Sequence, residues 1–229
     1  MKQRSQVQFL PEPPQKKVLA IQSEPLYSTV LQRGEGEPVR LAPLAVAAHR
    51  HMIQYDLKGA DPEFERACRE TYAALMDKYP FVPLKSVSLY EPRGDDTSMG
   101  VTYPDGRIEF NRYWFAGGMD RLDDAAKRDV LVDADGTPIA WHGDMVDEPV
   151  QVLTHEFFHC LALVLPEYKD WAKRAHLEAT LHPELSPSGY AFANADEFWA
   201  EAMASRELGF TFGALASLET FLRVNLPAQ

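Results

Sequence analysis

The chain is poor in cysteine, in positive charge relative to negative charge, and in long apolar runs, and each shortage excludes a class of protein. Two cysteines among 229 residues, Cys68 and Cys160, give no basis for a disulfide framework. The 23 lysines and arginines face 34 aspartates and glutamates, and the net charge of −11 argues against binding to nucleic acid or to anionic membranes. The longest apolar run is too short to span a bilayer and contains charged residues.

The amino-terminal residues also lack the apolar core of a secretion signal. We therefore expect a cytoplasmic protein, or one exported as an effector by a route that needs no signal peptide. Residues 1–55 are rich in proline, glutamine and glutamate and show little periodicity. We interpret them as an extension that wraps around the domain, pairs as a strand or docks as an arm. A pro-segment that blocks a cleft is the less favoured alternative.

Residues 56–229 are expected to form one domain of the α+β class. Hydrophobic residues make up 45% of the chain, enough for a substantial core. The turn Pro104-Asp105-Gly106 predicts a hairpin. Apolar periodicity and end signals predict helices at about residues 61–79, 149–165, 167–182, 195–208 and 214–224, and strands at about 86–90, 99–103 and 107–113.

Two further expectations concern the segments around these elements. In the helix at 167–182, Trp171 and Leu177 are expected to face the core. Residues 116–147 contain many charges and several glycines, and we expect a long irregular connection at the rim of a cleft.

The main positive signal lies in the helix expected at residues 149–165. It contains the stretch T-H-E-F-F-H, a match to the H-E-x-x-H pattern. Two histidines four residues apart on a helix stand one above the other and can bind one zinc ion, and the adjacent glutamate can activate a water molecule. His155 and His159 are therefore candidate metal ligands, and Glu156 is a candidate general base.

The surroundings of this motif favour a metal site over a chance match. Apolar residues cover nearly every direction around the helix axis, as expected for a buried helix. At about 100° per residue, His155, Glu156 and His159 fall in a sector roughly 100° wide. An unpaired carboxylate there would cost several kcal/mol or take up a proton, and a metal ion removes that cost. The alternative is a pair of core histidines, with Glu156 paired to a nearby base. Cys160 points elsewhere on the helix and is interpreted as a core residue.

A third metal ligand must come from another part of the chain, because catalytic zinc sites usually have three protein ligands and an open position. The helix expected after Asn194 carries Glu197 and Glu201, which are four residues apart and so point the same way. Glu197 also fits the third position of a capping box begun by Asn194, a role without chemistry. The spacing alone leaves the two glutamates as equal candidates.

A resemblance to a known family separates them. The H-E-F-F-H stretch followed by Y-x-x-x-N-x-x-E-F-W-A-E resembles the gluzincin metallopeptidases, and among them the catalytic domain of anthrax lethal factor and its relatives. The likeness covers about residues 147–165 and 189–206. It implies a zincin-like fold, in which a small, mostly antiparallel sheet with a backing helix lies above the H-E-x-x-H helix and a helical carboxy-terminal lobe lies below.

The resemblance also implies a role for each residue. His155, His159 and Glu197 would bind Zn²⁺, and Glu156 would act as general base. Tyr190, seven residues before Glu197, would donate a hydrogen bond or a proton to the tetrahedral intermediate or leaving group. Glu201 would orient a zinc-bound histidine. The hairpin would supply a sheet edge, at residues 100–103 or 108–111, that binds a peptide substrate as an added strand; an internal hairpin without that role is the alternative.

The expected function is therefore zinc-dependent hydrolysis of peptide bonds in a protein or peptide substrate, most simply as an endopeptidase. A non-catalytic or structural zinc-binding interaction module is the alternative from a different class. A structural site needs neither Glu156 nor Tyr190 and prefers four closed ligands. A zinc hydrolase of non-peptide amides is a third reading, whereas a deaminase would need a C-x-x-C pattern that the sequence lacks.

Overall fold

The computed structural model describes residues 52–94, 98–117 and 148–226. The chain divides into two units, residues 1–44 and 45–229, and every described residue belongs to the second unit. Most of the expected extension at residues 1–55 and most of the expected connection at 116–147 lie outside the described residues. The expected boundary between residues 55 and 56 falls inside the first strand, Gln54–Asp56.

The described residues form an α+β arrangement, as expected, and each predicted helix and strand has an observed counterpart to within a few residues. In chain order the elements are β1 (Gln54–Asp56), α1 (Pro62–Lys78), β2 (Ser86–Tyr90), β3 (Gly100–Thr102), β4 (Arg107–Asn111), α2 (Arg112–Phe115), α4 (Glu148–Ala162), α5 (Tyr168–Leu181), the short 3-10 helices η3 (Pro183–Leu185) and η4 (Tyr190–Phe192), α6 (Ala195–Glu207) and α7 (Leu215–Asn225). The elements β1, α2, η3 and η4 were not predicted, and residues 112–113 begin α2 instead of continuing the strand. None of the described helices combines the length and apolarity needed to cross a membrane.

The four strands form one mixed sheet in the order β1-β2-β4-β3. Strand β2 pairs in parallel with both β1 and β4, and only β3 and β4 pair antiparallel. The expectation of a mostly antiparallel sheet is therefore wrong. The strands β1 and β2 are parallel because α1 crosses over between them. The strands β2 and β4 are also parallel, because β4 and not β3 lies next to β2. As a result, β3 is an edge strand of the described sheet.

The predicted hairpin turn depends on Gly106. Its φ of 86° is in the left-handed region that glycine adopts without strain. A Cβ at this position would also collide with the carbonyl oxygen of Pro83. The turn reverses the chain between β3 and β4 and so fixes their antiparallel register, in which Gly100 faces Phe110 and Thr102 faces Ile108.

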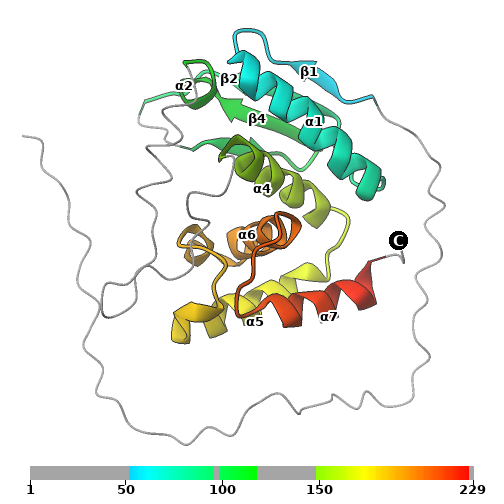
Figure 1. The fold of residues 1–229 in the computed structure, drawn as a ribbon, viewed down its shortest axis with the longest axis vertical. Helices are drawn as coiled ribbons and strands as arrows, with labels where there is room; N and C mark the ends of the chain where they lie inside the picture. Colours follow the sequence, from blue (N-terminus) through cyan, green and yellow to red (C-terminus); the bar gives the residue numbers. More distant parts are fainter. Residues whose placement is uncertain (1–51, 95–97, 118–147, 227–229) are drawn as a thin grey trace, which may run out of the picture. The chain divides into compact units, whose positions relative to one another are not determined.

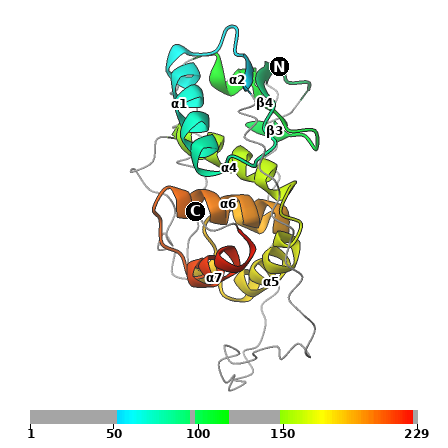
Figure 2. The ribbon, with the colours of Figure 1, turned by 90° about the vertical axis from the view of Figure 1, so that its right-hand side faces the viewer.

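Helix α4 lies in the middle of the described unit (Figures 1 and 2). It contacts α1 and β3 on one side and α6 on the other. Helix α1 packs on the sheet, where the rings of Phe64 and Phe110 are 5.3 Å apart in an edge-to-face contact. It also contacts α4 through the rings of Tyr72 and Phe157, which are 6.1 Å apart. All four side chains are fully buried, and residues 153–158 of α4 are buried as well, which confirms the predicted burial of the motif helix, whereas Leu163 and Val164 beyond its end are exposed.

Helix α6 packs between α4 and the pair α5 and α7. The buried Trp199 on α6 donates a hydrogen bond from its indole nitrogen to the carbonyl oxygen of Phe158 on α4, at 3.1 Å. On α5, Trp171 is buried as predicted, but Leu177 is 64% exposed, and its predicted core position is wrong. The buried face of α5 consists of Tyr168, Trp171 and three alanines, and the two aromatic rings contact Phe198 and Trp199 on α6.

Candidate metal centre

Helix α4 presents the two motif histidines on the face that meets α6. His155 is buried, and His159 is partly exposed. Their ring centroids are 4.8 Å apart, and their Nε2 atoms are 3.0 Å apart. The i, i+4 spacing on a regular helix is what brings both nitrogens to one point.

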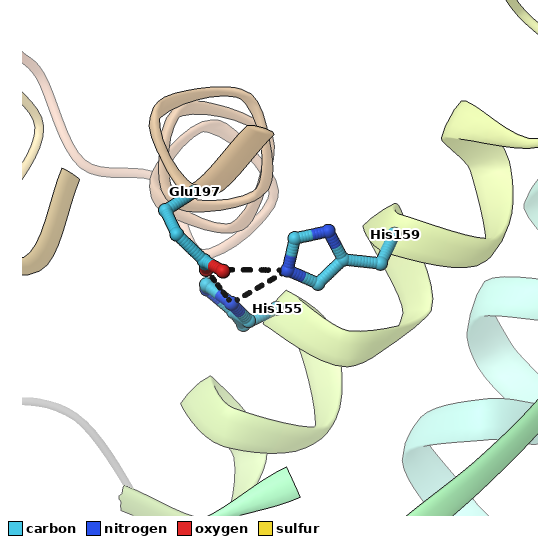
Figure 3. A group of neighbouring side chains, drawn as sticks. All are labelled: His155, His159 and Glu197. Carbon is cyan, nitrogen blue, oxygen red and sulfur yellow. Dashed lines mark hydrogen bonds and ion pairs between the residues drawn. The ribbon is translucent and has the colours of Figure 1, made fainter. Parts of the chain in front are cut away.

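Helix α6 supplies the carboxylate of Glu197 from the opposite side (Figure 3). Asn194 caps this helix as predicted, because its Oδ1 atom accepts hydrogen bonds from the backbone nitrogens of Asp196 and Glu197, at 2.9 and 3.0 Å. The Glu197 carboxylate is directed at the imidazoles. Its Oε2 atom lies 3.0 Å from Nε2 of His155 and 3.3 Å from Nε2 of His159.

These three atoms have the spacing of ligands to a single small cation. They form a triangle with sides of 3.0, 3.0 and 3.3 Å. Two donors that are each about 2.1 Å from a tetrahedral zinc ion lie about 3.4 Å apart, so zinc would require movements of only a few tenths of an ångström. Two imidazoles and one carboxylate suit zinc, and also its neighbours among the first-row transition metals. The residues fit a metal ion.

Glu201 lies one turn further along α6 and contacts the other nitrogen of His155. Nδ1 of His155 donates to Oε1 of Glu201 over 2.6 Å, and both groups are buried. A carboxylate in this position fixes the tautomer and the ring orientation of a metal-binding histidine. Among the two glutamates that spacing left equal, the structure places Glu197 beside the ligand nitrogens and Glu201 behind His155.

Glu156 and Tyr190 both line the cleft that exposes this centre. Glu156 is 6% exposed and accepts a hydrogen bond from the Thr102 hydroxyl. Tyr190 begins η4, is 48% exposed, and its ring centroid is 5.8 Å from that of His155. Its half-exposed position beside a motif histidine is not that of a core tyrosine.

The cleft has a volume of about 880 Å³. Edge strand β3 forms one wall with Gly100, Val101 and Thr102, and α4 and α6 form the other. Its surface is more apolar than polar. A concave site of this size with a few convergent polar groups is typical of ligand and substrate binding.

Comparisons with known proteins do not assign a family. No protein-family model matches the chain, and neither a curated protein nor a solved structure matches it. The function is therefore inferred from the geometry of the site.

Gly100 and Thr102 lie in one of the two candidate sheet edges, residues 100–103, but their contacts with Glu156 were not predicted. Both belong to a hairpin that was predicted, and a strand edge near the motif helix was expected. Which side chains of that edge face Glu156 depends on how the sheet packs on α4, and local sequence carries no signal for that. The predicted core role of Cys160 is confirmed, since the thiol is buried and burial raises its pKa to about 12.

The charges of the metal-free centre follow from the contacts between histidine and glutamate. Burial would lower the pKa of His155, but its hydrogen bonds to Glu197 and Glu201 raise that pKa to about 10. Burial would raise the pKa of Glu197, but hydrogen bonds from His155 and His159 lower it to about 2. Near neutral pH the centre therefore holds a protonated His155 and an ionised Glu197.

This charge state predicts that zinc uptake releases protons. A metal ligand needs an unprotonated nitrogen, so His155 must lose a proton, whereas the ionised Glu197 has none to lose. We expect release of at least about one proton per zinc at pH 7.5, and an affinity that rises about tenfold per pH unit up to about pH 10. Calorimetry in buffers of different ionisation enthalpy measures the released protons. His182→Ala, which removes an exposed histidine, should not change the result. Binding without proton release would contradict the charge assignment.

A second prediction concerns the residue behind His155. Replacing Glu201 with glutamine removes the charge that holds the His155 ring, and we expect zinc affinity to fall about 10- to 100-fold. Competition with a fluorescent chelator measures the change, and the exposed Glu178→Gln serves as the matched control. Unchanged zinc affinity in Glu201→Gln, with the metal-free protein folded, would show that Glu201 does not support the centre.

Proposed function

We propose that the protein is a zinc-dependent peptidase whose metal is held by His155, His159 and Glu197. The observation that supports this most strongly is the triangle of three ligand atoms beside the buried carboxylate of Glu156, in a cleft with room for a substrate. A structural zinc site would instead close the metal with a fourth protein ligand. The resemblance of the motifs to gluzincins agrees with this proposal.

Zinc held by His155, His159 and Glu197 would supply positive charge, which lowers the pKa of a nearby water and favours negative charge on a substrate carbonyl oxygen. Glu156 takes the proton from that water and passes it to the departing amine. The Tyr190 hydroxyl stabilises the oxyanion that forms when the carbonyl is attacked. Glu201 keeps the His155 ring in place by accepting its Nδ1 proton.

Strand β3 supplies the binding surface for the peptide backbone in this proposal. It is an edge strand of the described sheet and forms one wall of the cleft. An extended peptide that pairs with such an edge gains main-chain hydrogen bonds that depend little on its sequence. This arrangement supports cleavage of unfolded or extended protein segments.

Metal content and chelator-sensitive cleavage test the proposal directly. The purified protein should contain about one zinc per chain. It should cleave unfolded casein, lose that activity with 1,10-phenanthroline and recover it when zinc is restored. Bound zinc without cleavage of protein or peptide substrates would favour the non-catalytic module. Absence of metal binding would overturn both functions.

A further inference from the structure

The edge strand contacts the proposed general base as well as forming the wall of the cleft. The hydroxyl of Thr102 lies 2.7 Å from Oε2 of Glu156 and 3.1 Å from the backbone carbonyl oxygen of the same residue. A hydroxyl has one proton to donate, and the carboxylate contact is the shorter of the two. Hydrogen bonds to an ionised oxygen are shorter and about twice as strong as those between neutral groups. Thr102 therefore holds one oxygen of the carboxylate.

The other side of the Glu156 side chain lies against Gly100. A Cβ at Gly100 would be 2.7 Å from Oε1 of Glu156 and 2.8 Å from its Cδ and Cγ. Non-bonded atoms do not approach a Cβ this closely. Glu156 can therefore occupy its present position only because residue 100 has no side chain. The neighbour that would have to move is the flexible end of a glutamate, so the fold could accommodate a methyl group here at the expense of the carboxylate position.

Both contacts come from one face of one strand. Residues two apart on a strand point to the same side, and the pairing with β4 fixes the register of Gly100 and Thr102. Glutamate has three side-chain torsions, so a carboxylate without such contacts would sample several orientations. Strand β3 restricts the Glu156 carboxylate in two ways: Thr102 donates a hydrogen bond to Oε2, and the backbone at Gly100 lies close to Oε1.

We propose that Gly100 and Thr102 are positioning residues that hold the Glu156 carboxylate in its reactive orientation, so that the strand that binds the substrate also orients the general base. The inference rests on the proposed peptidase function. It predicts an effect on the chemical step and not on metal binding, because no hydrogen bond or ion pair joins Gly100 or Thr102 to the candidate ligands His155, His159 and Glu197 in the described structure. Misplacing a reacting group by about 1 Å can cost about 100-fold in rate.

The test compares Thr102→Val, Thr102→Ser and Gly100→Ala in the zinc-loaded protein with a casein-derived peptide. Thr102→Val removes the hydroxyl at nearly constant shape, and we expect kcat to fall about 10- to 100-fold while KM changes less than about twofold. Thr102→Ser keeps the hydroxyl and should retain most of kcat. Thr220→Val, which removes the hydroxyl of an exposed helical threonine, is the matched control and should behave as wild type.

Gly100→Ala supplies a readout that does not depend on activity. A crystal structure of the metal-free variant should show the Glu156 carboxylate displaced, with His155, His159 and Glu197 in place and zinc affinity unchanged. If Glu156 stays in place in Gly100→Ala, or if Thr102→Val keeps the wild-type kcat, the positioning role is overturned while the peptidase assignment stands. If the wild-type protein shows no chelator-sensitive hydrolysis, the proposed function fails and the inference fails with it.

Discussion

Glu156→Gln should retain zinc with wild-type affinity and lose about 10³-fold in kcat. Glutamine has nearly the same shape and can still accept the hydrogen bond from Thr102, but it cannot take a proton from water. General acid–base catalysis contributes about 10²- to 10⁴-fold, which sets the size of the expected loss. Zinc content by mass spectrometry of metals and kcat from peptide cleavage measure the two quantities separately.

Glu70→Gln, an exposed substitution on α1, is the control for Glu156→Gln and should change neither quantity. Full activity in Glu156→Gln would remove Glu156 as the general base. Loss of zinc together with activity would instead show that Glu156 supports the metal. The two outcomes are distinguishable because zinc content is measured on the same preparation.

Glu197→Ala should lose zinc far more completely than Glu201→Gln. The first change removes a proposed ligand, and the second removes only a group that orients one. The loss in Glu197→Ala should therefore exceed the 10- to 100-fold range typical of outer partners. Chelator competition measures both affinities on one scale. The metal-free form of Glu197→Ala should also show a lower pKa for His155, since one of the hydrogen bonds that raises it is gone.

The comparison between these two variants also decides which glutamate is the ligand. If Glu201→Gln lost zinc completely and Glu197→Ala retained it, the assigned roles would be reversed: Glu201 would be the ligand and Glu197 the supporting residue. Equal, small effects would leave the centre without an acidic ligand. Proton release and zinc affinity in the exposed control Glu178→Gln should match wild type throughout.

Local signals in the sequence were sufficient for the helices that carry the candidate site. Asn194 marks the start of α6 by capping it, and Gly209, with a φ of 84°, follows its end. The predicted end of α4 at residue 165 was too late, because the helix stops at Ala162. The next backbone N–H groups bond three residues back, and Pro166 disfavours helical backbone just before it.

Relations between distant segments could not be read from the sequence. Glu197 and Glu201 share a helix face, so their different positions are set by how α6 packs against α4. The parallel direction of β2 likewise depends on the crossover through α1. Leu177 was assigned to the core because it is large and apolar, whereas the face of α5 that is buried carries Tyr168, Trp171 and three alanines, and Leu177 lies outside it. In each case tertiary packing overrides a local pattern.

The hydrogen bond from Trp199 to Phe158 joins α6 to α4 in the metal-free protein. Trp199 lies between Glu197 and Glu201 on α6, and Phe158 directly precedes His159 on α4. A buried hydrogen bond thus holds α4 and α6 together next to the position where an ion would bind. The candidate ligand groups are therefore brought together by folding itself, and if they bind an ion we expect its loading and removal to leave the packing of α4 on α6 unchanged.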